Sequence, residues 1–384
     1  MNVHVPGVRD LTATAQIDAS RPGAAAALRA QLGAGPFALV LVFASPEADF
    51  PALVEGIAAE FPDTPAALCT TAGEIGPTGY AEGTIVAFAL AADQFAAEVV
   101  RMGPLRDVQR ALLTAPLAST RAGLAARCPD MEEEFAFLVV DGLSGREDAL
   151  MAGLAPALGH IPIFGGSAGD GDRYGRAFVG HNGKAFEDEA LLCLIRTRCP
   201  VRVFTLDHFE PSSRRLVVTD ADPESRTVLT LNADPAAHEY ARLLGLMPAD
   251  LGAPIFALRP LVVRIGDRHH VRSIQSMDEN GALRFFSAID EGLVLTLSEA
   301  GHLADHLARE FDALADPVPP AAILACDCLF RKLEVEQHQA VQRVSDLLVR
   351  ANVTGFSTYG EQIGALHVNQ TMTGVAIYPP GTAL

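Results

Sequence analysis

Three segments of the chain repeat the same order of apolar and polar positions. In each segment an apolar run is followed by a helical pattern and then by a second apolar run. The successive runs lie at Phe37–Phe43, Phe50–Phe61 and Ala66–Cys69, at Phe135–Val140, Asp148–Leu158 and Ile161–Phe164, and at Ala322–Cys326, Glu336–Arg350 and Val353–Phe356. Short apolar runs that alternate with helical patterns predict β-α-β units.

Each second strand runs into the same four-residue pattern, [Ser/Thr]-x-Gly-[Asp/Glu], which we call a tip. The tips are Thr71–Glu74, Ser167–Asp170 and Thr358–Glu361, and further strands are predicted at Thr84–Leu90, Arg176–Val179 and Thr371–Tyr378. Ligands of α/β proteins usually bind just beyond the carboxyl ends of strands, where these tips fall. We therefore expect one shared pocket, with ligand-binding candidates Thr71, Gly73, Glu74, Ser167, Gly169, Asp170, Thr358, Gly360, Glu361 and Asn369. The competing interpretation is local, with glycine making a turn and the hydroxyl and acid satisfying nearby backbone groups.

The remaining pattern predicts an α/β fold of two domains, built from repeated β-α-β-β units with an antiparallel meander inserted in the second domain. Residues 1–35 form an N-terminal helical extension, residues 36–222 the first domain and residues 223–384 the second. Strand-like runs continue the first domain at Leu191–Ile195 and Val201–Leu206. The meander spans Leu261–Leu297, with Asn-Gly and Gly-Asp at its turns.

The amino-acid composition limits which binding partners and which cell compartment are expected. The chain has 47 acidic and 29 basic side chains and a net charge of −18, which argues against nucleic acid or an anionic membrane as partner. No apolar stretch approaches the ~18 residues of a membrane span, and the N-terminus has no secretion-signal pattern. Six scattered cysteines do not form a disulfide framework, so we expect a cytoplasmic protein with reduced thiols.

Candidate catalytic and cofactor motifs are weak. The glycine-rich run 165–171 lacks the Lys-[Ser/Thr] ending and the following helix of a phosphate loop. Cys326 and Cys328 are more typical of a strand core than of a metal site, although a thiolate or redox role stays open. We expect no enzymatic activity; an enzyme using Glu74, Asp170 or Glu361 as general acid or base is an alternative, and a pure interaction scaffold is another.

His367 differs from the other histidines. It lies in a polar run, His367–Thr371, between the third tip and the last strand. Such a run either satisfies loop backbone or lines a pocket. His367 is therefore the first candidate among the histidines for an axial metal or haem ligand.

Several of these motifs together resemble the FIST family of bacterial sensory proteins. The resemblance covers residues 36–378 and rests on Thr70–Ile75, Gly165–Gly171, Asn232–Tyr240, Gly355–Gln362 and His367–Thr371. It implies a small-ligand sensor in signal transduction. Stretches 141–148 and 326–334 are similar to the NosP group, which implies haem, nitric oxide sensing and a separate histidine kinase or cyclic-di-GMP enzyme (diguanylate cyclase or phosphodiesterase) as partner in a two-component system. The alternative is a sensor of an amino acid or other metabolite without haem, and no family residue can be carried over as the axial ligand.

Overall fold

The apolar runs of the sequence form fully buried parallel strand pairs. The computed structural model describes residues 11–107, 110–266 and 268–384. Its three parallel pairs are β2 (Phe37–Ala44) with β3 (Ala66–Thr70), β8 (Glu133–Asp141) with β9 (Ile163–Ala168), and β22 (Ala322–Cys328) with β23 (Val353–Thr358). Parallel strands covered on both faces carry nearly continuous apolar sequence, which is why these runs do not alternate.

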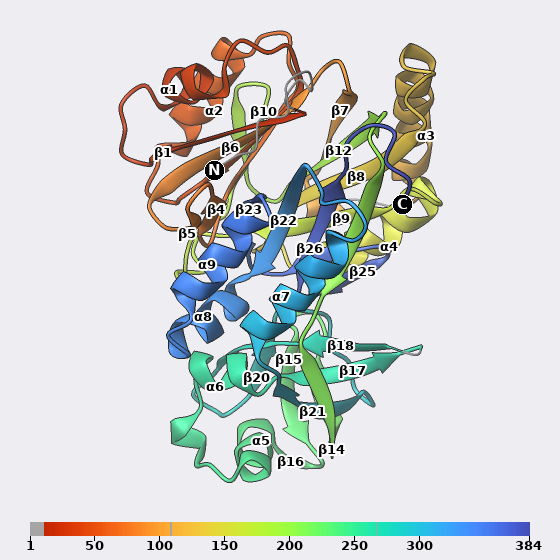
Figure 1. Cartoon of the computed structure of the whole chain (residues 1–384). Coiled ribbons are helices and arrows are strands. Elements are labelled where there is room, and N and C mark those ends of the chain that lie inside the picture. Colours follow the sequence, from red (N-terminus) through yellow and green to blue (C-terminus); the bar gives the residue numbers. More distant parts are fainter. Residues whose placement is uncertain (1–10, 108–109, 267) are drawn as a thin grey trace.

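Helices cover the outer face of each sheet (Figure 1). The two strands of a pair are joined by α2 (Phe50–Glu60), by α4 (Glu147–Leu158), and by α8 (Leu329–Gln337) followed by α9 (Val341–Arg350). Another helix precedes each pair, namely α1 (Ala24–Leu32), α3 (Arg110–Arg127) and α7 (Leu303–Leu314). The apolar sides of these helices pack on their own sheet in three separate clusters.

Each sheet is completed by two antiparallel strands on the other side of its first strand. The return strands are β6 (Thr84–Ala91), β12 (Ala190–Thr197) and β26 (Met372–Ile377), and the edge strands are β1 (Thr12–Asp18), β7 (Phe95–Met102) and β13 (Val201–Leu206). The three sheets therefore have the same strand order. The chain is built of three equivalent units.

A short hairpin after each tip leaves its own unit and joins another sheet. The hairpins are β4 (Glu74–Gly76) with β5 (Gly79–Ala81), β10 (Val179–His181) with β11 (Lys184–Phe186), and β24 (Glu361–Ile363) with β25 (Leu366–Val368). The first unit's hairpin pairs with β23 of the third unit, the second unit's with β3 of the first, and the third unit's with β9 of the second. These three pairings connect the three units in a closed ring.

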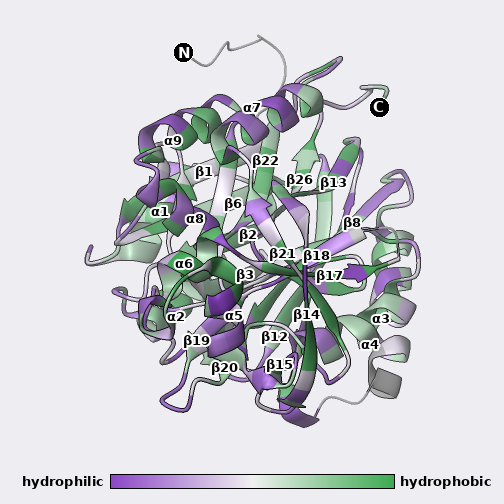
Figure 2. Ribbon diagram, turned by 90° about the horizontal axis from the view of Figure 1, so that it is seen from below, coloured by the Kyte–Doolittle hydropathy of each residue, from purple (hydrophilic) through white to green (hydrophobic). Residues whose placement is uncertain are grey.

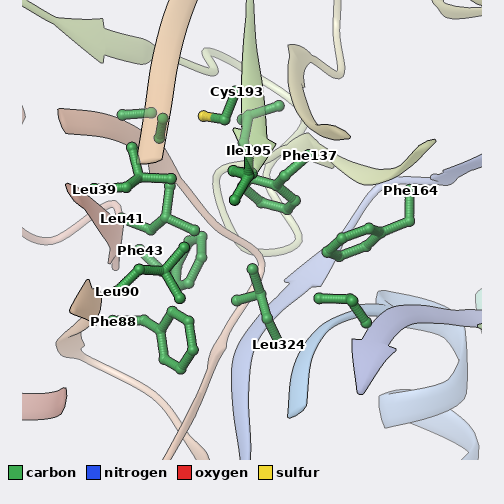
Figure 3. Close-up of a cluster of buried hydrophobic side chains, with 14 of the residues drawn as sticks. Leu39, Leu41, Phe43, Phe88, Leu90, Phe137, Phe164, Cys193, Ile195 and Leu324 are labelled. Carbon is green, nitrogen blue, oxygen red and sulfur yellow. The ribbon is translucent and has the colours of Figure 1, made fainter. Parts of the chain in front are cut away.

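The inner faces of the three sheets share one apolar core. Figure 3 shows side chains from all three units meeting there, among them Phe43, Phe137 and Leu324. Phe43 stacks on Phe356 with ring centroids 4.7 Å apart, which joins the first and third units. Because the outer faces are covered by helices, every sheet is buried on both sides.

An antiparallel sheet is inserted into the third unit between β13 and α7. Its strands are β14 (Phe209–Asp222), β15 (Thr227–Leu231), β16 (Asp234–Pro235), β17 (Leu261–Ile265), β18 (Arg268–Arg272), β19 (Ile274–Met277), β20 (Leu283–Phe285) and β21 (Val294–Ala300). Helices α5 (Ala236–Leu244) and α6 (Ala253–Leu258) belong to the same insertion. Figure 2 views the molecule from this side.

The predicted α/β fold of repeated units with an inserted meander is confirmed. The strand predicted at Arg176–Val179 was assigned wrongly, because the return strand of the second unit is β12 and residues 171–178 form a loop. The N-terminal segment contains the edge strand β1 as well as the predicted helix. The predicted boundary between residues 222 and 223 falls at the turn that joins β14 to β15. No helix in the described ranges is long and apolar enough to cross a membrane.

Candidate functional site

The three tips meet at one place, at the carboxyl ends of the parallel pairs. Backbone hydrogen bonds join them in a cycle: Ser357 N–H donates to Gly73 O at 2.7 Å, Gly169 N–H to Thr70 O at 3.1 Å, and Ser167 N–H to Gly360 O at 2.8 Å. The hydroxyl residue of every tip is fully buried. The structure thus brings together the tip residues that the sequence singled out.

In the first and third tips the glutamate bridges the tip and the return strand of its own unit. Thr71 donates to one oxygen of Glu74, whose other oxygen accepts from the backbone N–H (3.2 Å) and hydroxyl (2.9 Å) of Thr84. The third tip repeats this arrangement. Thr358 donates to Glu361, which accepts the N–H (3.1 Å) and hydroxyl (2.9 Å) of Thr371. We call each such set a Thr–Glu–Thr clamp.

Burial makes the clamp carboxyls hard to ionise. It raises the pKa of Glu74 to about 7 and that of Glu361 to about 8, even though the threonine hydrogen bonds act in the opposite direction. A protonated glutamate also fits the first clamp, because the Thr71 hydroxyl can then donate to Ala44 O at 3.3 Å. These acids are engaged in holding the fold.

The second tip is arranged differently. Asp170 accepts the backbone N–H groups of Gly175 and Arg176, both at 2.9 Å, and the hydroxyl of Tyr359 at 2.5 Å. Tyr359 belongs to the third tip, and its ring lies 4.7 Å from that of Tyr174 in the loop. Asp170 therefore fastens the 171–178 loop over the meeting point of the tips.

Glycine at the third tip permits a close approach. A Cβ atom on Gly360 would lie 2.3 Å from His367 Cε1 and 2.8 Å from Asn369 Nδ2. A methyl group there would push both side chains away from the tip. The glycine thus places His367 and Asn369 directly against the backbone of the third tip.

Buried polar atoms that lack a hydrogen-bond partner in the described protein gather beside this tip. They are Gln362 Oε1, His367 Nε2 and Asn369 Nδ2 from the third unit, with Arg272 Nε and Ser273 Oγ from the inserted sheet. Such atoms are rare in folded proteins, and a group of them marks a place where a ligand or ordered water binds. We call these five residues the third-tip cluster.

Short contacts hold the cluster together across the two parts of the molecule. Arg272 Nη1 donates to His367 O at 3.4 Å, and Gln362 Nε2 lies 3.2 Å from His367 Nδ1. The hydroxyl of Ser287, from the loop after β20, donates to Asn369 Oδ1. Turning the Asn369 amide over would leave its oxygen unpartnered instead of its nitrogen, so one polar atom stays available in either orientation.

Arg272 carries a buried charge that the described protein does not pair. Its side chain donates only to the backbone carbonyls of Val271 (3.5 Å) and His367 (3.4 Å). The nearby carboxylates are already used, because Arg226 binds Glu147 at 2.8 Å and Asp148 at 3.3 Å. Burial lowers the pKa of Arg272, and the charge of Arg226 acts in the same direction, whereas the carboxylate of Asp148 acts against it. A buried charge of this kind is stabilised by an anionic partner.

The surroundings of His367 do not fit a haem. Its Nε2 is unpartnered, as an axial ligand requires, but the ring is enclosed by the tip backbone and by polar side chains rather than by an apolar slot. Two cavities of the described protein, of about 610 and 220 Å³, lie along α1 and α2 and beside Phe37, and His367 lines neither. Among the residues that the structure describes, no three His, Cys, Asp or Glu side chains are placed so that they could hold a metal ion together.

Cys326 and Cys328 are buried in β22. Burial raises the pKa of both thiols well above its ordinary value, so both are protonated at neutral pH. Cys326 belongs to the central core and Cys328 packs toward the inserted sheet. Their surroundings are those of small core side chains.

Sequence reasoning named two members of the third-tip cluster, His367 and Asn369, and missed three. Gln362 directly follows the third tip, and its place in a polar run could have drawn attention to it. Arg272 and Ser273 lie in the meander, where alternating polar residues are expected on any half-exposed sheet. Nothing in the sequence pattern connects them with the tip.

Comparison with family models gives two matches that together cover most of the chain. The FIST N domain matches residues 38–234 and the FIST C domain matches residues 236–364. A search of curated proteins gave no match. FIST domains are sensory domains that bind small ligands in signal transduction. The chain belongs to the FIST family.

Proposed function

We propose that this protein is a non-catalytic sensor of a small polar metabolite with an anionic group, and that the third-tip cluster binds it. One observation carries the proposal. Five buried polar atoms without protein partners surround the third tip, and one of them belongs to the unpaired guanidinium of Arg272. A ligand anion there would satisfy the charge, because arginine binds carboxylate or phosphate through two parallel N–H groups.

The other members of the cluster suit the remaining polar groups of such a ligand. Asn369 offers an amide N–H and Gln362 offers a carbonyl oxygen. Neutral His367 donates at Nε2, because its Nδ1 accepts from the amide of Gln362. Donors and acceptors side by side favour a molecule with both kinds of group, such as the amino acids that the family resemblance implies. The tip glycine keeps the backbone close enough to shape the floor of the site.

Ligand binding at this place would connect two parts of the molecule. Arg272 and Ser273 belong to the inserted sheet, whereas Gln362, His367 and Asn369 belong to the third unit. A ligand that contacts both parts stabilises the arrangement in which they lie together, and so shifts the equilibrium between arrangements. We propose that a separate histidine kinase, diguanylate cyclase or phosphodiesterase in the cytoplasm reads this shift.

Binding of single metabolites to the purified protein tests the proposal. Thermal shift across a panel of amino acids, dicarboxylates and sugar phosphates should give at least one hit, and calorimetry should then give its affinity. Arg272→Met should weaken binding at least about a hundredfold, since it removes a charge-assisted pair. Arg284→Met, at an exposed position of β20, is the matched control and should bind normally. Unchanged binding by Arg272→Met, or a panel without any anionic hit, would overturn the assignment.

A haem-dependent nitric oxide sensor is the second candidate. The unpartnered Nε2 of His367 favours it, but a haem would bind there only if the polar side chains that enclose the ring moved apart. Protein purified from haem-supplied cells would then show a Soret band that shifts under nitric oxide. His367→Ala would remove or alter that band. Protein that stays colourless with added haem would exclude the haem sensor and leave the metabolite sensor as the remaining candidate.

A further inference from the structure

A second buried polar group lies away from the third-tip cluster and forms a chain of five side chains. It runs from Tyr80 through Asp327, Arg331 and His208 to Glu334. Tyr80 donates to Asp327, Arg331 Nε lies 2.6 Å from Asp327 Oδ1, Arg331 Nη1 lies 3.2 Å from His208 Nδ1, and His208 Nε2 lies 2.9 Å from both oxygens of Glu334. The side chains of Asp327, Arg331 and His208 are completely buried. We call this chain the relay.

The direction of its hydrogen bonds determines the protonation of His208. A guanidinium can only donate, so Nδ1 of His208 must accept from Arg331. The single proton of a neutral imidazole is then on Nε2 and points at Glu334. A second proton, on Nδ1, would face the N–H of Arg331 with two positive charges 3.2 Å apart. The relay is therefore complete only while His208 is neutral.

The relay lies where the inserted sheet joins the rest of the molecule. His208 is in the connection from β13 into β14, and Gly301 is in the connection from β21 into α7. These two connections touch, because Gly301 N–H donates to His208 O at 2.9 Å. Arg331 and Glu334 come from α8 of the third unit, and Tyr80 comes from the hairpin of the first unit. Opening the relay would free both connections together.

We infer that the relay is an acid-sensitive latch: neutral His208 holds the two connections of the inserted sheet against α8, and protonation of His208 releases them. The inference is independent of any ligand. It requires that movement at the joint increase as His208 takes up a proton, while the three-unit body stays closed.

The charged groups around His208 set the pH at which this happens. Burial lowers the pKa of His208 below its ordinary value, and the positive charge of Arg331 lowers it further. The hydrogen bond to Glu334 acts in the opposite direction and raises it. Asp207, on the same connection, also raises this pKa. His306 of α7 has its ring 6.3 Å away, and burial lowers its pKa to about 4, with Arg331, His208 and Arg309 adding to the effect. His306 thus stays neutral over most of the mildly acid range.

Hydrogen–deuterium exchange of the ligand-free full-length protein tests the latch. Amide hydrogens in peptides covering residues 207–216 and 296–303 should exchange about tenfold faster for each pH unit below the pKa of His208, after correction for intrinsic exchange rates. Peptides in β2 and β8 should not. Exchange at the joint that does not depend on pH, or equal opening of the body strands, would overturn the inference.

Two variants separate His208 from other acid effects. His208→Gln stays neutral and should abolish the acid-dependent opening, whereas His338→Gln, at an exposed position after α8, should keep it. Glu334→Gln still accepts from Nε2 but removes the charge that favours protonation. The opening should therefore begin about one pH unit lower in this variant. If His208→Gln keeps the wild-type response, or if Glu334→Gln leaves its onset in place, the latch is excluded.

Discussion

The first and third tips differ from the second, although all three share one sequence pattern. In the first and third tips a glutamate is the first residue of the exchanged hairpin and reaches a threonine at the return strand. In the second tip the shorter aspartate is followed by the 171–178 loop and binds the N–H groups of that loop. The pattern therefore marks a position in the fold, at which the two glutamates close a clamp and the aspartate fastens a loop.

The largest expected effect is a loss of stability at alkaline pH that comes from the clamp glutamates and not from the second tip. Because the pKa of Glu361 is raised to about 8, the folded state holds a proton that the unfolded chain has lost above its ordinary pKa. Stability should thus fall as pH rises from about 5 to about 9, by roughly 4 kcal/mol for this residue. Urea unfolding at a series of pH values measures this change in the free energy of unfolding.

Glutamine reproduces the protonated acid, so Glu361→Gln should flatten that pH dependence. Glu74→Gln should flatten a smaller part, since the pKa of Glu74 is raised only to about 7. Glu279→Gln, at an exposed turn, is the control for removing a charge. A Glu361→Gln profile as steep as that of the wild type would show that this clamp does not hold a proton.

The next largest effect should come from replacing the acid of a tip by alanine, which should destabilise the protein more at the third tip than at the second. Glu361→Ala leaves the N–H and hydroxyl of Thr371 unpaired in a buried site and should cost about 3 kcal/mol in unfolding free energy. Asp170→Ala should cost about 1 kcal/mol, because Gly175 and Arg176 are exposed and water can replace the carboxylate. Equal losses would mean that the second tip is as closed as the others.

The smallest expected effect concerns the contact between the second and third tips. Tyr359→Phe removes the hydroxyl that donates to Asp170 and accepts the N–H of Tyr174 at 3.3 Å. We expect a loss of about 0.5 kcal/mol in unfolding free energy and faster amide exchange confined to residues 171–176. Faster exchange in β24 as well would show that the two tips are coupled more tightly than the comparison implies.

The strands and tips could be predicted because burial on two faces leaves a direct mark in the sequence. Phe37–Ala44 is apolar at nearly every position, and so are its counterparts. The hairpins carry no such mark. Lys184–Phe186 is only three residues long, one polar and two apolar, and nothing in it indicates that its hairpin pairs with β3 of another unit.

The candidate site was predicted in part for a similar reason. His367 and Asn369 follow a tip within a few residues, so chain proximity suggested them. Arg272 reaches the same place from a strand far along the sequence, and only the tertiary structure connects it with His367. The second return strand was predicted as a strand at Leu191–Ile195, but its place in the unit was given to Arg176–Val179. Val179 does begin a strand, β10, but β10 belongs to the exchanged hairpin.

The ring of exchanged hairpins has a consequence for dissecting the molecule. A fragment ending near residue 234 would contain β9 without β24, and so would present an unpaired row of backbone groups from a strand that is buried in the whole chain. Its hairpin β4–β5 would likewise have lost β23. Expression of residues 1–234 or of residues 235–384 alone should therefore yield aggregates, and co-expression of these two fragments should restore solubility by fragment complementation.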